Sequence, residues 1–448
     1  MSLSAALEGL TLAALVAPAL VVALLGVTSL LHRALPERAV GLLARLAAWA
    51  ATLCLLAALP VFVLGGADRH HYEYGQWFGV GHTSFLANLV IDARSLVFAL
   101  MSALCCGVVA TFSQRYLHKE PGFHRFFVLL LCFQSGMSLV ALGGSVEVLF
   151  AGWELIGVSS ALLVGFFHER ASPVRGALRV IVIYRISDAA MLSAAIYAHH
   201  VVGTGEIDVL FGVVMGPGAL TSTDATIIAG LLALATAGKC AQLPFSGWLP
   251  RALEGPTPSS GLFYGALSLH AGCFLLLKSA GILERAPLVA LGVGVMGALT
   301  ALYATLVGRV QADIKSSLAF AALTQVGVIL VEIALGLYTL AMLHIVGHAA
   351  LRLVQFLRAP TVLHDFHELE DTLGRHPAPT GRHLRRLIPA RAELWLYRFA
   401  LERGYLDAIL EVIVVAHLRR FVRFCDRCER RLGDLLAGDA AGSKPRRD

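Results

Sequence analysis

The stretch from Thr226 to Leu249 reads TIIAGLLALATAGKCAQLPFSGWL. Its first thirteen residues are apolar or small, Lys239 follows, and Pro244 comes five residues after the lysine. Proline lacks a backbone donor and interrupts a helix, so the pattern predicts an apolar helix that breaks just after a charged residue. Such a break frees backbone carbonyl groups beside a buried charge, which is typical of ion-transport sites in membrane proteins.

The composition places this helix in a membrane protein. Of the 448 residues, 57% are hydrophobic and only 15% are charged, whereas a soluble chain carries about 25% charged residues. The imbalance excludes a soluble enzyme, a disordered chain and a small disulfide scaffold. The net charge of +6 is modest, so we expect no nucleic-acid binding.

Eleven runs of residues are long and apolar enough to cross a bilayer, which requires about 20 residues in a helix. The sequence therefore predicts an all-α polytopic membrane protein with about eleven transmembrane helices and a discontinuous helix near 243–258. The predicted spans are 10–31, 41–64, 88–112, 124–142, 146–167, 176–200, 226–249, 259–280, 287–308, 315–335 and 338–358.

Charge divides the chain into parts. We expect N-terminal transmembrane helices over 1–87, a core over 88–360 and a polar tail over 361–448, which holds 29 of the 66 charged residues. Basic residues gather in alternate connections, and the opposite connections hold only Arg69 and Arg285. The positive-inside rule then predicts a periplasmic N-terminus and a cytoplasmic tail.

The tail has two predicted parts. Residues 361–390 have the composition of an irregular link, and 391–436 alternate apolar and basic residues at helical spacing. This second part is predicted to be a basic amphipathic helix. It could lie on anionic lipid, dock a partner, or be solvated.

Two of the five lysines, Lys239 and Lys278, fall within predicted spans of a chain that otherwise prefers arginine. A buried lysine can lose its proton, whereas arginine stays charged. Both are therefore candidates for proton transfer, with snorkelling of the ammonium to a helix end as the alternative.

Acidic and basic residues also occur in the middle of neighbouring spans. Glu154 has no basic residue near it in its own helix, so it must pair with another helix or be protonated. Arg185 and Asp188 are three residues apart, which permits an ion pair within one helix. That pair either neutralises itself permanently or holds and releases a neighbouring charge.

The eleventh span carries His344, His348 and Arg352 in one stripe, since they are four residues apart. Histidines can relay protons near neutral pH. The same spacing could ligate zinc, but no third ligand lies nearby in the sequence. Tyr264 and His270 in the eighth span could line the same hydrated path.

At these residues the chain resembles the proton-pumping antiporter-like subunits of respiratory complex I and the related Mrp antiporters. The resemblance runs from about Asp92 to about Arg358. It is carried by Gly-Trp-Glu around Glu154, Tyr-Arg-Ile-Ser-Asp at 184–188, Gly-Lys-Cys-Ala-Gln-Leu-Pro at 238–244, Gly-Pro-Thr-Pro at 255–258, Ala-Asp-Ile-Lys-Ser-Ser-Leu-Ala at 312–319 and the stripe ending at Arg352.

The resemblance implies a role for each matching position. Glu154 would be the acid through which the proton enters, paired with buried Lys239, and Arg185 and Asp188 would modulate that pair. His344 and His348 would carry protons along a central axis. Arg352 stands where relatives usually have lysine, and Tyr264 stands where they have histidine, so His270 is a candidate substitute.

Within this family, a shortened core followed by a basic tail resembles the membrane subunit of DAB inorganic-carbon accumulation complexes. That resemblance implies a bacterial inner-membrane protein with a large cytoplasmic partner, a zinc protein like a carbonic anhydrase. Cation flow, of protons or sodium ions, would drive CO2 hydration to bicarbonate. No cofactor, metal or chemical active site is expected in this chain itself.

Two other functions stay open at this stage. One is an antiporter-like proton- or sodium-translocating subunit of a complex I-, hydrogenase- or Mrp-type assembly. The other is a non-conducting anchor in which the charged motifs survive as structural ion pairs.

Overall fold

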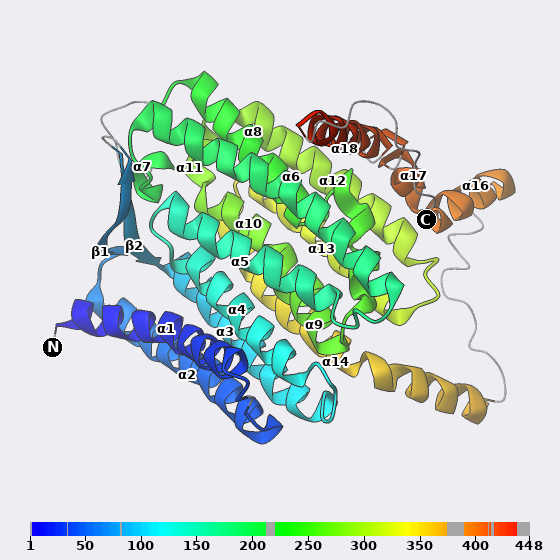
Figure 1. Ribbon diagram of the computed structural model, residues 1–448, viewed down its shortest axis with the longest axis horizontal. Helices are drawn as coiled ribbons and strands as arrows, with labels where there is room; N and C mark the ends of the chain where they lie inside the picture. The colour runs from blue at the N-terminus through cyan, green and yellow to red at the C-terminus, as the bar shows by residue number, and fades with distance from the viewer. Residues whose placement is uncertain are drawn as a thin grey trace.

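A computed structural model describes residues 2–33, 35–80, 83–211, 220–373, 389–410, 412–413 and 416–436 (Figure 1). Ten of the described helices are long and apolar enough to cross a membrane, which confirms the predicted polytopic all-α class. They are α1 (Leu3–Leu30), α2 (Glu37–Gly65), α3 (Ala93–Tyr116), α4 (Phe123–Leu142), α5 (Val146–Val164), α6 (Ala171–Val202), the composite helix Thr257–Lys278, α12 (Pro287–Gly308), α13 (Ile314–Ala334) and the membrane part of α14 (Tyr338–Leu373).

The remaining predicted span, 226–249, corresponds to α8 (Ser222–Lys239), which packs along α6 and against α10 (Ser268–Lys278). Its ends carry Asp224 and Lys239, which make it less apolar than its neighbours. Thr221 and Asp224 form a reciprocal capping box that fixes where the helix begins. About eleven membrane helices therefore agree with the structure.

Residues before α3 form a β-hairpin, which the sequence did not predict. Strands β1 (Arg69–Val80) and β2 (Thr83–Asp92) pair antiparallel, with Arg69 opposite Asp92. The predicted span over 88–112 is therefore wrong at its start, because the first five of those residues belong to β2. The helix begins only after Asp92, whose side chain accepts a hydrogen bond from the Ser95 backbone N–H.

An ionic clamp holds this hairpin on the helices. Arg69 contacts Asp92 and Asp208 at 2.6 Å each, and Asp208 lies on the short helix α7 (Ile207–Leu210). Burial alone would raise the pKa of Asp92, but the Ser95 backbone N–H and Arg69 hold it below its ordinary value. We call this side of the bundle, with β1 and β2, the hairpin end (Figure 1).

The predicted discontinuity is present, and it begins directly after Lys239. The chain leaves α8 through Ala241, whose φ is +53°, and continues as two short turns, η1 (Phe245–Trp248) and η2 (Pro250–Glu254). The Leu243 N–H donates to Thr300 Oγ1 on α12 at 3.1 Å, so a neighbouring helix satisfies a backbone donor that the break exposes.

The next membrane helix is composite. It starts as α9 (Thr257–Ser260), widens into the π-helical segment η3 (Gly261–Leu267) and ends as α10. Within it the Ser268 N–H donates to the Phe263 carbonyl, five residues back, in place of the usual four. π segments of this kind often mark functional sites because they shift the backbone bonding register. The apolar window of this helix is entirely buried within the bundle.

The tail differs from its prediction at the start and agrees with it later. Helix α14 continues to Leu373, so the expected irregular link over 361–390 is wrong for its first part, and residues 374–388 lie outside the described residues. The predicted boundary at 360 falls inside this helix, and the division into three parts stays a prediction. Helices α16 (Ala390–Leu401), α17 (Leu406–Leu410) and α18 (Ala416–Leu436) follow, with the short turn η4 (Arg403–Tyr405) between the first two.

Two glycines let α12 and α13 approach closely. A Cβ added at Gly327 would lie 2.5 Å from the Gly297 carbonyl oxygen, and a Cβ at Gly297 would lie 2.5 Å from the Gly327 carbonyl oxygen. Small residues at such crossings allow helix backbones to pack in a membrane, where lipid tails compete with apolar side chains.

We therefore expect Gly327→Ala to destabilise the protein by about 1–3 kcal/mol, because the added methyl group overpacks the crossing. The matched control is Gly292→Ala on α12, the other helix of this crossing, where nothing lies within 4 Å of the new Cβ. Thermal unfolding in detergent, followed by size-exclusion chromatography, measures both. Equal melting temperatures for the two variants would contradict this packing.

Candidate functional site

Four charged residues from three helices form one continuous chain of contacts. Arg185 Nη2 on α6 lies 2.6 Å from Glu154 Oε2 on α5 and 2.7 Å from Asp188 Oδ2 on its own helix. Asp188 Oδ1 lies 3.7 Å from Lys239 Nζ at the end of α8. The structure thus brings together all four residues of this predicted group, in the order Glu154, Arg185, Asp188, Lys239.

This order corrects one expectation. The resemblance implied a direct pair between Glu154 and Lys239, but Arg185 and Asp188 lie between them. One guanidinium nitrogen contacts both carboxylates, so the two acids compete for it. A change in the charge of Glu154 therefore reaches Lys239 through a shift of Arg185 relative to Asp188.

Lys239 is 0% exposed, and aromatic rings take the place of water around it. Its Nζ donates to the Trp153 carbonyl at 3.1 Å and lies 4.4 Å from the centre of the Tyr184 ring and 4.7 Å from that of Trp153. Rings at this distance attract a cation through their quadrupoles. A Cβ at position 157 would lie 3.0 Å from Nζ, so Gly157 gives the ammonium its room.

The outer end of the chain reaches the flank of the bundle. The Arg185 side chain is 51% exposed and the Glu154 side chain 26% exposed, although both lie near the middle of their helices. The residues around them on this flank are apolar and exposed, among them Val158, Leu162, Leu178 and Ile181. We call this surface the α5–α6 flank.

The second group of polar residues lies where α10 meets α14. His270 Nε2 is 3.0 Å from His348 Nδ1, and the Arg352 Nε–H donates to His348 Nε2 at 3.0 Å. His270 Nδ1 lies 2.5 Å from the Ala266 carbonyl oxygen. The structure thus confirms that His348 and Arg352 share one stripe, and it adds His270 to them.

The arginine fixes the protons on both imidazoles, because guanidinium can only donate. His348 Nε2 must accept, so in neutral His348 the proton is on Nδ1 and is donated to His270 Nε2. His270 then carries its own proton on Nδ1 and donates it to Ala266. All the hydrogen bonds point the same way, from Arg352 to the π segment.

His344 belongs to a separate cluster. Its Nδ1 lies 2.9 Å from Glu332 Oε1 and its Nε2 lies 3.1 Å from Gln325 Oε1, both on α13. The His344 and His348 rings meet edge to face with centroids 6.1 Å apart. The two imidazoles thus have different partners, which does not fit a shared zinc ion, and no metal-binding group of three or more His, Cys, Asp or Glu occurs among the described residues.

Tyr184 and Tyr264 lie between the two groups. The Tyr184 ring contacts Lys239, and its hydroxyl lies 3.3 Å from Ser268 Oγ, two residues before His270. The predicted site residue Tyr264 is fully buried near Ser160 and Tyr184, and its hydroxyl makes no hydrogen bond of ordinary geometry with the described residues. This buried hydroxyl could bind a water molecule between the two groups.

Lys278 lies apart from both groups. Its Nζ donates to the carbonyl oxygens of Ala141 at 2.9 Å and Gly143 at 2.7 Å, at the end of α4. An ammonium there satisfies carbonyls that the helix leaves unpaired and opposes the helix dipole. These contacts account for the lysine structurally, and its part in ion transfer stays a prediction.

Sequence reasoning did not identify His199 as part of a polar pair. His199 Nε2 and Glu147 Oε1 form an ion pair at the hairpin end. The pair adjoins a cavity of about 160 Å³ that is lined by polar residues, including Ser145, Glu147, Thr204 and Glu206. The signal was weak, because nothing in the sequence indicates that α6 brings its last turn beside the first turn of α5.

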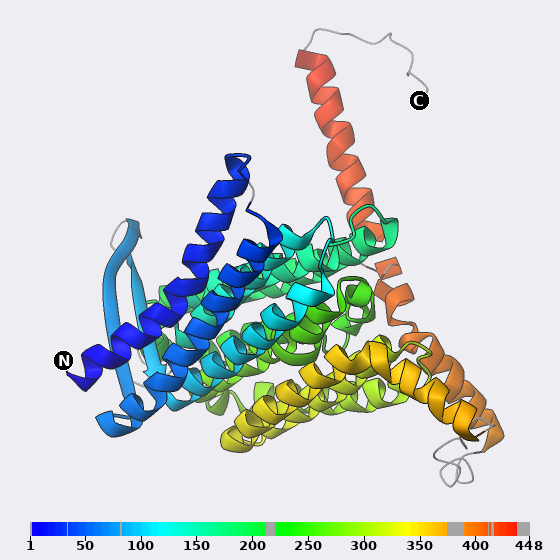
Figure 2. The same ribbon diagram turned by 90° about the horizontal axis from the view of Figure 1, so that it is seen from below.

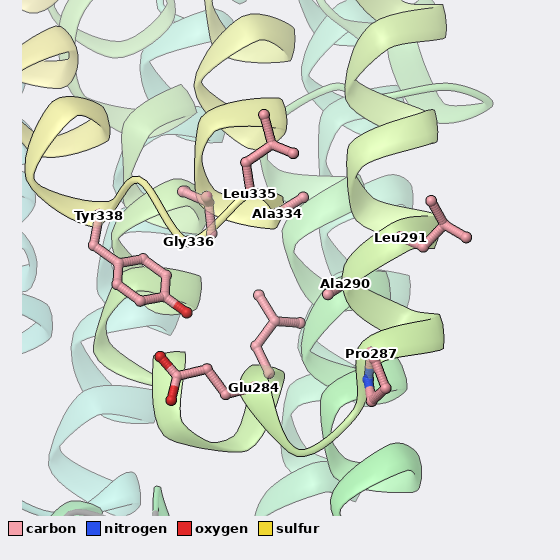
Figure 3. A pocket seen from close by; sticks show the side chains of 10 residues that line it. Glu284, Pro287, Ala290, Leu291, Ala334, Leu335, Gly336 and Tyr338 are labelled. Atoms are coloured by element: carbon pink, nitrogen blue, oxygen red, sulfur yellow. The ribbon is translucent and has the colours of Figure 1, made fainter.

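A larger cavity of about 430 Å³ lies between α11 (Ala280–Glu284), α12, α13 and the start of α14 (Figure 3). Its lining is mostly apolar, and the Glu284 carboxylate and the Tyr338 hydroxyl point towards each other. It contains none of the predicted site residues, so cavity size alone does not locate the charged groups.

Comparison with known proteins matches this core to one family. Residues 144–378 match the model of the transmembrane region described as NADH:quinone oxidoreductase/Mrp antiporter, and residues 77–127 match the N-terminus of complex I chain 5. NADH-ubiquinone oxidoreductase chain 5 of Schizophyllum commune is 33% identical over 66% of this chain and 43% of its own length. NADH-quinone oxidoreductase subunit L of Mycobacterium tuberculosis is 30% identical over 72% of this chain and 53% of its own length.

Two solved structures share the fold. A chain of the Mrp complex from Dietzia sp. DQ12-45-1b aligns with a TM-score of 0.63 at 24% identity, over 80% of this chain and 37% of that one. A chain of an archaeal membrane-bound sulfane sulfur reductase aligns with a TM-score of 0.66 at 19% identity, over 80% and 70%. The chain spans about half the length of the curated relatives it matches. It belongs to the family of NADH:quinone oxidoreductase and Mrp antiporter transmembrane subunits.

Proposed function

We propose that this chain conducts a cation, the proton, across a bacterial inner membrane and couples that flow to a cytoplasmic partner that hydrates CO2. In this proposal the hairpin end faces the periplasm and the tail faces the cytoplasm. The partner is a large zinc protein like a carbonic anhydrase, and the product is bicarbonate.

The observation that best supports proton conduction is the continuous row of charged side chains from Glu154 to Lys239. An ionisable residue inside a membrane span costs about 2.5–3.5 kcal/mol on insertion scales. Four such residues from three helices touch in sequence here, and the innermost, Lys239, is wholly buried. Groups that costly are retained in membrane proteins chiefly for ion movement.

The contacts support a stepwise transfer. When a proton neutralises Glu154, Arg185 loses one of its two carboxylate partners and binds Asp188 more strongly. Asp188 then stabilises the Lys239 ammonium less, and the lysine can release its proton on the side of Tyr184 and Ser268. When Glu154 then gives up its proton inwards to the neutral lysine, the lysine is reloaded, the negative charge on Glu154 returns and Arg185 again binds both carboxylates.

The tail supports a cytoplasmic partner. Helix α18 presents exposed Arg420, Arg427 and Arg430, together with exposed Phe421 and Leu432. Figure 2 shows α18 pointing away from the bundle, so both kinds of side chain are accessible to a second protein. Hydration of CO2 releases a proton with each bicarbonate, and a proton-conducting subunit beside the catalyst could draw the reaction forward.

The α5–α6 flank favours a second candidate, an antiporter-like subunit of a complex I-, hydrogenase- or Mrp-type assembly. A guanidinium at mid-membrane depth is costly against lipid, so Arg185 calls for a cover. An adjoining membrane subunit would provide one, and the two solved relatives come from multi-subunit complexes.

Lys239→Met should reduce proton flux at least tenfold, because methionine keeps the volume but cannot carry a proton. Lys239→Arg should reduce it to a similar degree, since arginine keeps the charge but does not release its proton. Flux is measured with a pH-sensitive dye enclosed in vesicles that contain the purified assembly.

The matched control for this experiment is Lys119→Met, in the exposed connection between α3 and α4. It should leave the flux unchanged. Full flux in Lys239→Met protein, with normal assembly, would instead identify the charged chain as a structural feature of a non-conducting anchor.

His270→Gln and His348→Gln should each lower the flux about tenfold, and the double variant should be no slower than either single one. Two residues that act in series lose their joint function once either is removed, so their effects do not add. His200→Gln, at the exposed end of α6, is the control. Additive losses would mean that the two histidines serve separate paths.

Affinity purification of the tagged chain in mild detergent, followed by mass spectrometry and zinc analysis, distinguishes the two candidates. The first predicts one large zinc protein in about equal amount, lost when residues 416–436 are deleted. Recovery of iron–sulfur or further antiporter-like membrane subunits, independent of that deletion, would establish the second candidate instead.

A further inference from the structure

The tail returns to the membrane bundle at the broken helix. Helix α16 packs against α12, and α17 packs against η1, the first turn after the break. Ala400 is buried, and Phe399 and Leu406 pack against the apolar core. We call the segment Phe399–Leu406 the strap, since it crosses from one of these contacts to the other.

The strap turns through an unfavourable backbone conformation. Arg403, Gly404 and Tyr405 have φ values of +49°, +66° and +57°, a region that residues with side chains rarely adopt. The Tyr303 hydroxyl on α12 donates to the Arg403 carbonyl at 3.1 Å and holds the turn in place. A Cβ at Gly404 would lie 3.1 Å from Phe399 Cζ and 3.2 Å from Tyr303 Cε2, so a side chain there would crowd both rings as well as strain the backbone.

The other side of η1 is in contact with the surroundings of Lys239. The Trp248 indole N–H donates to the Gly238 carbonyl at 3.1 Å, one residue before the lysine. The Trp248 ring meets the Tyr184 ring edge to face at 5.2 Å, and Tyr184 is the ring that contacts the ammonium. Packed contacts therefore continue from the strap through η1 and Trp248 to Lys239.

We propose that Trp248 is a positioning residue for Lys239 and that the strap sets its position according to what is bound at α18. In this proposal the strained turn has a relaxed alternative, and the binding of a partner at α18 decides between the two. The tail would then report partner binding to the buried lysine through contiguous packing. This inference rests on the proposed function, since it supplies the link between the partner and the proton path.

Hydrogen exchange tests the link without any measurement of transport. In the purified assembly, Gly404→Ala should raise amide exchange over 240–256 at least several-fold, because the added methyl group lifts the strap from η1. Gly292→Ala on α12, where nothing lies within 4 Å of the new Cβ, is the matched control. Deletion of 416–436 should raise the same exchange, and the combined change should exceed neither alone.

Proton flux then tests the consequence. Trp248→Phe keeps an aromatic ring but removes the hydrogen bond to Gly238. Full-length Trp248→Phe protein should still retain the partner, but its flux should no longer change when 416–436 is deleted. The control is Trp77→Phe, an exposed tryptophan on β1 at the hairpin end. A merely structural Trp248 would lower the yield or melting temperature and leave that sensitivity intact.

The failures of the two proposals are distinguishable. Unchanged exchange over 240–256 in Gly404→Ala protein overturns the strap as a link, whatever the flux. Absence of flux in the unaltered assembly overturns proton conduction, while the exchange result still decides whether the tail reaches the broken helix. If Gly404→Ala and the deletion of 416–436 raised amide exchange over 240–256 additively, the two changes would act on the broken helix independently. That result would also overturn the link.

Discussion

The ammonium of Lys239 is the constraint around which the core of this protein is arranged. A charge with no access to water must be stabilised by its neighbours, and here one carboxylate, one carbonyl and two aromatic rings share that task. The break after α8, the glycine at position 157 and the close approach of α5 and α6 all follow from bringing these groups to one point. Removing any of them leaves either a charge without a partner or a gap in a closely packed interior.

The charged chain is graded from the flank to the centre, and this gradient gives it direction. Arg185 is half exposed, Asp188 is 4% exposed and Lys239 is wholly buried, so the dielectric response weakens inwards. A change of charge at Glu154 acts first on Arg185, 2.6 Å away, and is passed on to Asp188 and Lys239 in surroundings that screen it less. The same gradient explains why the flank needs a covering protein, whereas Lys239 is covered within its own subunit.

Much of this architecture could be predicted from the sequence, because membrane insertion imposes simple rules. Apolar runs of about 20 residues located the helices, and Pro244 located the break. The site residues could be chosen because charges are rare in such runs.

What could not be predicted is contact between helices. The hairpin before Asp92 depends on Arg69 meeting Asp208 from a distant part of the chain, and the place of Arg185 between Glu154 and Asp188 depends on how α5 and α6 pack. His199 was missed for the same reason, and Lys278 was chosen by position although its partners are the carbonyls that end α4.

The π segment before His270 has a consequence for how often protons could pass the two histidines in the proposed path. The Ala266 carbonyl of this segment accepts the His270 proton, and with Arg352 at the opposite end it orients both imidazoles the same way. A proton transferred along this row of hydrogen bonds would exchange the donor and the acceptor in each bond. A second proton could not follow until both imidazole rings had rotated back. Because Arg352 occupies His348 Nε2, its side chain would have to move away each time a proton is transferred. In the proposed function, the two histidines would therefore pass protons one at a time, with a delay while the hydrogen bonds reset, and would not form an open pore.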